Sequence, residues 1–137
     1  MRKRDREDFS CVVYVEGPRK TTVLIQKPGR LIFEFPGGKK ELGENPRQAA
    51  ARELAEETGL QLPSSAFQLV TKQSIRSWRK RWTLYLFQVV LQSYAGLRTV
   101  GTEGEFVSIH KQRDFVKRHD FHRRHYKLFS RSGLLPK

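Results

Sequence analysis

The sequence predicts a layered domain of helices and strands, of the α/β or α+β class. Runs of β-branched and aromatic residues, typical of strands, stand on both sides of one clearly bounded helix. A stretch near the C-terminus has the apolar spacing of a second, amphipathic helix. The chain of 137 residues suits one domain and leaves little room for another, so we expect a single domain over residues 1–137.

The N-terminal part predicts three extended segments. Residues 9–15 and 21–26 read as strands, and because the Gly17-Pro18 turn separates them we expect them to pair as a hairpin. A short apolar segment over residues 31–35 follows and ends at Pro36.

The helix expected next has marked ends. Asn45 is a good N-cap, Pro46 suits the first helical position, and Gln48 stands where a capping-box partner belongs. Strong helix formers dominate residues 48–58, and Gly59 is a natural C-terminal stop.

The remaining elements are three strands and a helix. Residues 67–75 and 82–92 predict two longer strands, and the second is apolar on both faces, which favours a central place in the sheet. A short strand is expected over residues 105–109 and an amphipathic helix over residues 111–129.

Composition narrows the class of protein. Lys and Arg number 27 against 14 Asp and Glu, and the net charge of +13 favours a polyanionic partner such as a nucleotide, a nucleic acid or phosphate. No apolar run is long enough for a membrane span, so we expect no membrane partner. The single Cys11 excludes a disulfide framework, and residues 1–8 are charged with no apolar stretch of signal-peptide type behind them. A cytoplasmic location is therefore expected.

An acidic cluster lies inside this basic chain. Glu53, Glu56 and Glu57 stand at i, i+3 and i+4 of the expected helix, hence on one face, and Arg52 is one turn before Glu56. Carboxylates supply the hard oxygen ligands that suit Mg²⁺ or Mn²⁺. The Gly37-Gly38 turn lets the backbone approach that face and lend a carbonyl oxygen. The group indicates a metal–phosphate site with a carboxylate as general base, although a solvated glutamate face has the same spacing.

Residues 38–60 also resemble a known family motif. Gly38, Glu44 and the run from Arg52 to Leu60 match the Nudix box at every specified position. The resemblance implies an α/β/α sandwich with a mixed β-sheet that holds the box as a loop–helix–loop. It also implies hydrolysis, dependent on Mg²⁺ or Mn²⁺, of a nucleoside diphosphate linked to another group.

The same resemblance assigns roles to residues. Glu53, Glu56 and Glu57 match the family's metal ligands, with Glu53 or a later glutamate as base. Arg52 matches the arginine that orients them. The other matches are Glu44 as a supporting acid, the Gly38 carbonyl as a ligand, and Glu103 or Glu105 as an extra acid. A Gly follows Glu103, which favours Glu103 over Glu105.

The substrate is less well specified. Residues 33–39 look like the MutT-type subgroup, which cleaves nucleoside triphosphates, including oxidised guanine nucleotides, and in which the position of Phe35 contributes to a nucleoside pocket. That subgroup reads the base with an asparagine shortly after an Asp-Phe pair. None follows Asp114-Phe115, which leaves recognition of oxidised guanine open. The further candidates for substrate binding are Lys27, Arg30, Lys39, Arg76 and Trp78.

Two alternatives remain. The basic loop over residues 76–81 and the basic stretch over residues 115–124 would also suit an RNA 5′-end pyrophosphohydrolase, or a nucleotide- or RNA-binding module without turnover. His122 and His125 are three residues apart, but no cysteine joins them and a zinc site is not expected. The sequence is compatible with a monomer or a homodimer.

Overall fold

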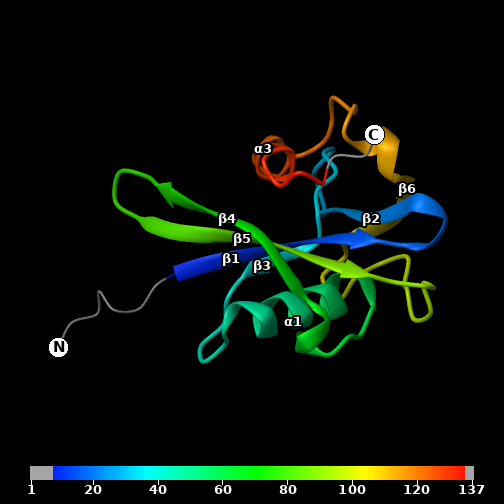
Figure 1. The fold of residues 1–137 in the computed structure, drawn as a ribbon, viewed down its shortest axis with the longest axis horizontal. Coiled ribbons are helices and arrows are strands. Elements are labelled where there is room, and N and C mark those ends of the chain that lie inside the picture. Colours follow the sequence, from blue (N-terminus) through cyan, green and yellow to red (C-terminus); the bar gives the residue numbers. More distant parts are fainter. Residues whose placement is uncertain (1–7, 135–137) are drawn as a thin grey trace.

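A computed structural model describes residues 8–134 of the chain (Figure 1). Residues 1–7, which carry most of the charged N-terminal segment, lie outside the described part. The described residues form strands (β), α-helices (α) and short 3-10 helices (η). In chain order these are β1 (Asp8–Glu16), η2 (Pro18–Lys20), β2 (Thr21–Gln26), β3 (Gly37–Lys39), α1 (Pro46–Thr58), η3 (Ser64–Ala66), β4 (Gln68–Arg76), β5 (Arg81–Val90), β6 (Phe106–Lys111), α2 (Gln112–Phe115) and α3 (Arg123–Ser130). None of the helices between residues 8 and 134 is long and apolar enough to cross a membrane.

The main sheet is mixed, with the strand order β3-β1-β5-β4. β1 and β5 pair in parallel over nine positions from Asp8↔Trp82 to Glu16↔Val90, and the other pairs are antiparallel. β5 lies between two neighbours, as its apolar sequence predicts. β2 and β6 form a separate two-stranded sheet.

The expected hairpin between the first two strands is wrong. β2 pairs with β6, and at the turn between β1 and β2 the backbone forms an isolated bridge between Gly17 and Thr21. Arg19 and Lys20 have positive φ angles in the turn η2, which directs the chain out of the first sheet and into the second. Turn residues mark a reversal in the sequence, but they do not specify which strand becomes the neighbour.

Alternating side chains of β1 supply two cores on opposite faces of the sheet. Cys11, Val13 and Val15 pack with Leu54 and its neighbours on α1. Val12 and Tyr14 point the other way and join a cluster with the buried apolar residues of α2 and α3, namely Phe115, Leu128 and Phe129. Figure 1 shows α1 on one side of the sheet and α3 on the other. The α/β/α sandwich is confirmed.

The predicted helix over residues 111–129 is two short helices. Phe115 and Phe121 are both buried, and six residues along one helix would set them about 240° apart, so one of them would face solvent. The chain instead leaves the helix after Phe115. Phe33 donates its N–H to the Asp120 carbonyl (2.7 Å) and accepts one from His122 (2.8 Å), which pins the connecting segment beside the extended piece before β3.

The ends of α1 are as predicted. Asn45 accepts a hydrogen bond from the Gln48 N–H and donates its own to the Gln48 side chain, both at 2.9 Å. Gly59 ends the helix in the left-handed conformation, with φ of 86°. These caps fix which turn of the helix carries each box residue.

Candidate active site

The Nudix-like segment folds as a loop–helix–loop whose first residues belong to the sheet. Gly37 and Gly38 lie in β3 and pair with Val12 and Cys11 of β1. The Gly37 N–H donates to Glu57 Oε1 at 2.7 Å, which ties the strand to the last turn of α1. A Cβ on Gly38 would stand 2.5 Å from Glu53 Oε2, so only glycine allows that carboxylate so close to the strand.

Gly37 is the position least tolerant of a side chain. A Cβ there would lie 2.0 Å from the Cys11 carbonyl oxygen, and this backbone cannot move without breaking the pairing of β1 with β3. We expect Gly37→Ala to destabilise the protein by about 2–3 kcal/mol. Gly29 has a positive φ, but a Cβ added to it would meet no atom within 4 Å, so Gly29→Ala should cost only about 1 kcal/mol. Urea unfolding of both variants checks the difference, and equal losses would contradict this packing argument.

Arg52 holds the acids of the loop and the helix together. Its guanidinium makes two hydrogen bonds to Glu44, at 2.6 and 3.1 Å. It also donates to Glu53 and Glu56, both at 3.2 Å, and to the Lys39 carbonyl at 3.0 Å. This fork geometry fixes several carboxylates with one cation. The pairing with Glu56 is the one that the helix spacing predicts.

The charge around this arginine is uneven. Its hydrogen bonds hold the pKa of Glu44 below the ordinary value. Burial instead raises the pKa of Glu53, and raises that of Glu57 from 4.5 to about 9, with the Glu53 and Glu105 charges adding to the rise. The half-buried Glu53 and the buried Glu57 therefore form a carboxylate pair in which Arg52 reaches only Glu53 by a hydrogen bond. Oxygen donors in such a state fit a hard divalent cation, whose charge would offset the repulsion.

The two candidates for the extra acid lie in different surroundings. Glu103 is exposed, and its N–H donates to Glu105 Oε1 at 3.1 Å. Glu105 is only 4% exposed, and its charge contributes to the raised pKa of Glu57. The glycine that favours Glu103 in the sequence, Gly104, takes up a positive φ in the turn. These positions favour Glu105, whose carboxylate is the one near the buried pair.

A pocket of about 260 Å³ opens beside this pair. Gly37 and Gly38 line it together with three of the predicted substrate residues, Lys27, Arg30 and Lys39. Lys27 Nζ is 4.0 Å from Glu34 Oε1, and its charge opposes part of the rise in the pKa values of Glu53 and Glu57. The pocket therefore extends from Gly38 of the box to a wall that carries the basic side chains of Lys27, Arg30 and Lys39.

The other predicted substrate residues do not line this pocket. Phe35 is 1% exposed and packs among Tyr14, Phe115 and Phe129 of the second core, so its ring supports the wall and offers no face to a base. Arg76 and Trp78 lie exposed at the tip of the β4–β5 hairpin. Ser77 and Lys80 of the same tip line a groove that shares Ser10, Lys39 and Trp82 with this pocket, so a role of Arg76 and Trp78 in substrate binding stays a prediction.

Sequence reasoning overlooked Glu34 as a pocket residue. It is only 5% exposed, and a charged side chain that is so buried needs a partner. Its position inside the apolar segment 31–35 was a signal that could have found it. Its neighbours His122 and His125 could be found only from the fold, since they come from the other end of the chain.

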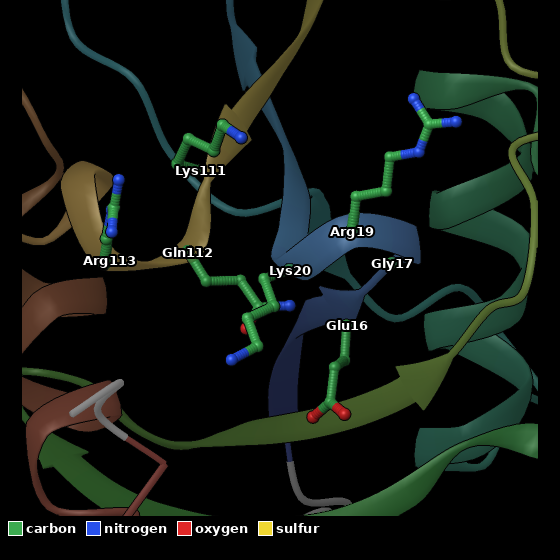
Figure 2. A pocket seen from close by; sticks show the side chains of 7 residues that line it. All are labelled: Glu16, Gly17, Arg19, Lys20, Lys111, Gln112 and Arg113. Carbon is green, nitrogen blue, oxygen red and sulfur yellow. The ribbon is translucent and has the colours of Figure 1, made fainter.

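A larger pocket, of about 550 Å³, lies elsewhere (Figure 2). It is lined by residues from the end of β1, from η2 and from the β6–α2 junction, and none of the box residues takes part. Four of its side chains are basic: Arg19, Lys20, Lys111 and Arg113.

The fold and this geometry define an α/β/α sandwich that carries a carboxylate helix after a Gly-Gly strand. The model of the NUDIX domain family matches residues 5–132, and the chain belongs to this family. Its relatives are MutT-like. It is 37% identical over 77 residues to the 8-oxo-dGTP diphosphatase of Escherichia coli strain K12, covering 56% of this chain and 58% of that protein.

Other similarities agree with this assignment. The chain is 32% identical over 90 residues to the uncharacterized Nudix hydrolase YvcI of Bacillus subtilis strain 168, covering 64% of this chain and 54% of that protein. Both matches span less than two thirds of the relative's length. The crystal structure of a MutT/nudix family protein from Enterococcus faecalis superposes with a TM-score of 0.72 at 16% identity, covering 96% of this chain and 62% of the other. That likeness shows the shared fold.

Proposed function

We propose that this protein is a Mg²⁺- or Mn²⁺-dependent Nudix pyrophosphohydrolase that cleaves nucleoside triphosphates or related nucleoside diphosphate compounds. One observation carries the proposal. The half-buried Glu53 and the buried Glu57 lie against Gly38 and Gly37, and these two glycines line a pocket whose walls also present Lys27 and Lys39. Such a site has separate places for a divalent cation and for the phosphates that the cation accompanies.

The residues that would hold the metal ion are Glu53, Glu56, Glu57 and Glu105, with the Gly38 carbonyl. When bound, the ion would supply positive charge that neutralises the diphosphate oxygens. Arg52 keeps the carboxylates of Glu53 and Glu56 oriented, and Glu44 holds Arg52 in place. Lys27, Arg30 and Lys39 bind and orient the phosphates.

A carboxylate of the box takes a proton from the attacking water. Glu53 is the best placed for this role, because burial raises its pKa and its Oε2 lies against Gly38. A base with a raised pKa holds the proton better than an ordinary carboxylate. The cation–carboxylate network around Arg52 keeps that oxygen in one position during the transfer.

The predicted extra acid is tested by a pair of variants. We expect Glu105→Gln to lower kcat/KM on the order of 10²-fold, because it removes a buried negative charge beside Glu57. Glu103→Gln alters only an exposed side chain and should change kcat/KM less than about threefold. Steady-state kinetics of both variants with Mg²⁺ decide between them, and a larger loss in Glu103→Gln would reverse the assignment.

An RNA 5′ end is the second candidate substrate, and one observation favours it. A groove of about 550 Å³ lined by Lys39, Lys40 and Lys80 adjoins the first pocket and shares Ser10, Lys39 and Trp82 with it. A longer polyanion could follow these lysines away from the box.

Product analysis separates the two candidates. With Mg²⁺, the proposed enzyme should convert free nucleoside triphosphates to monophosphate and pyrophosphate. An RNA-end enzyme should leave the free nucleotides nearly intact and release pyrophosphate from triphosphate-ended RNA. Absence of turnover on both substrates, with nucleotide binding retained, would favour a binding module.

A further inference from the structure

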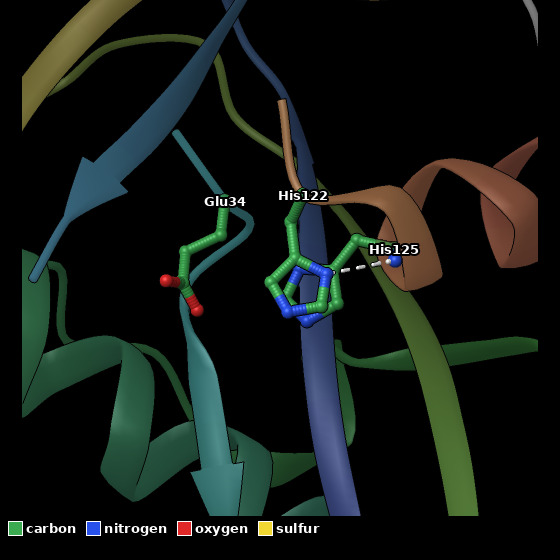
Figure 3. Close-up of side chains that lie close together, drawn as sticks. All are labelled: Glu34, His122 and His125. Carbon is green, nitrogen blue, oxygen red and sulfur yellow. Dashed lines mark hydrogen bonds between the residues drawn. The ribbon is translucent and has the colours of Figure 1, made fainter. Parts of the chain in front are cut away.

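Glu34, His122 and His125, none of which belongs to the box, form a cluster on the wall of the pocket. One nitrogen of each ring and one carboxylate oxygen lie within 4.8 Å of one another. The two imidazoles stack with their centroids 3.9 Å apart, and Figure 3 shows the Glu34 carboxylate beside them. All three residues line the pocket that also contains Gly38 and Lys39.

Backbone hydrogen bonds set the tautomers of both histidines. His125 Nδ1 accepts the Phe35 N–H at 3.2 Å, and His122 Nδ1 accepts the His125 N–H at 3.3 Å. Burial and neighbouring cations lower the pKa of each ring, which favours the neutral form. A neutral imidazole whose Nδ1 accepts must carry its proton on Nε2. Each ring therefore has an Nε2–H donor left.

This arrangement is unfavourable for a metal ion, although the residue types suit one. A histidine binds a metal through an unprotonated ring nitrogen. Here the unprotonated nitrogen of each ring already accepts a backbone N–H, and releasing the Phe35 N–H would leave a buried donor unpaired. The cations Lys27 and Arg30, 4.0 and 3.9 Å from the Glu34 oxygens, also oppose another positive ion.

Glu34 supplies the hydrogen-bond acceptor of the cluster, whereas the two histidines supply donors. Its Oε2 is buried and has no hydrogen-bond partner in the part of the chain between residues 8 and 134. The nearby lysine and arginine stand beyond hydrogen-bond length. A buried acceptor without a partner is costly, so the site is complete only when a donor arrives. The carboxyl group offers an acceptor oxygen in either protonation state.

A nucleobase with an amine and a carbonyl on one edge matches this pattern. Guanine and cytosine each carry an exocyclic amine at one corner of the Watson–Crick edge and a carbonyl oxygen at the other corner, so they offer a donor to Glu34 and an acceptor to the histidines. Adenine has no carbonyl oxygen, and uracil has a carbonyl oxygen at both corners and no amine. The pocket volume of about 260 Å³ admits a base, and the half-buried Trp82 provides an aromatic wall.

We propose that Glu34, His122 and His125 read the edge of an amino-oxo nucleobase, so that guanine and cytosine nucleotides are preferred over adenine and uracil nucleotides. The inference rests on the proposed function to the extent that the pocket takes a nucleotide. Glu34 accepts from the amine, the histidines donate to the carbonyl oxygen, and the phosphates run past Lys27 toward the box.

Binding of monophosphates tests this base-reading site without requiring turnover. Calorimetry of the full chain with GMP, CMP, AMP and UMP should give affinities at least tenfold higher for GMP or CMP than for AMP and UMP. Glu34→Gln places an amide donor where an acceptor stands and should reduce that ratio to less than threefold. His122→Asn keeps a helix cap, removes the ring donor and should do the same. His119→Ala, which changes an exposed neighbour outside the pocket, should leave the ratio unchanged.

The outcomes separate this inference from the proposed function. Selective binding without hydrolysis of any nucleotide would sink the proposed activity and support the base-reading site. Hydrolysis of all four triphosphates at similar kcat/KM, unaffected by Glu34→Gln, would sink the base-reading site and leave the activity standing. Stoichiometric Zn²⁺ binding, or visible Co²⁺ absorption bands, lost in His122→Asn would assign the cluster to a metal and overturn the inference.

Discussion

Glu57→Gln is expected to lower kcat/KM with Mg²⁺ on the order of 10³-fold. The amide keeps an oxygen to accept the Gly37 N–H, so the strand stays attached to the helix, but the negative charge is gone. A hard divalent cation binds carboxylate oxygens far better than a neutral amide. The loss should therefore come from weaker metal binding and poorer stabilisation of charge on the diphosphate.

A matched variant separates this from general damage. Glu16 is partly buried at the far end of β1 and contacts Gln88, so Glu16→Gln makes the same chemical change away from the box. It should retain kcat/KM within about twofold. Isothermal titration with Mg²⁺ or Mn²⁺ should show weaker binding in Glu57→Gln only. A Glu57→Gln enzyme with near-normal turnover would refute the metal assignment.

The second large effect is on stability in the absence of metal. Burial raises the pKa of Glu57 to about 9, well above its ordinary value of 4.5. Between these values the folded state holds the proton more tightly than the unfolded state, so ionisation of Glu57 opposes folding. The free energy of unfolding should fall as the pH rises from about 5 to 9, by up to about 1.4 kcal/mol per pH unit from this group.

Denaturant unfolding in EDTA at several pH values checks this slope. Glu57→Gln cannot ionise, so its stability should fall less across the window, and the difference from the unmodified protein isolates Glu57. Added Mg²⁺ should stabilise the unmodified protein most at the alkaline end, where the ionised carboxylate is available to bind it. A steeper fall in Glu57→Gln than in the unmodified protein would show that the carboxylate is not destabilising.

Local sequence was enough to predict the helix and the box. The caps at Asn45 and Gly59, and the i, i+4 pair of Arg52 and Glu56, depend only on residues within a turn or two. The central place of β5 followed from its apolar faces.

What could not be predicted depends on long-range pairing. The partner of β2 is β6, whose paired residues are 80 to 90 positions further along the chain, and no turn residue encodes that choice. Glu34 meets His122 and His125 only because the segment before β3 and the turn before α3 lie side by side. The preference for Glu103 over Glu105 relied on a neighbouring glycine, whereas the positions of the two carboxylates relative to Glu57 depend on how the loop packs.

The hydrogen bond from the Gly37 N–H to Glu57 fixes the position of the Glu57 carboxylate relative to the sheet. Gly37 takes its position from Val12, and β1 takes its own from nine paired positions along β5. The distance between Gly37 and the carboxylate helix α1 therefore depends on how β1 is paired within the sheet. Substitutions of core residues in β1 should therefore shift the Glu57 carboxylate by small amounts and change the turnover rate, although these residues do not contact a nucleotide. Laboratory evolution could use such core positions to adjust turnover.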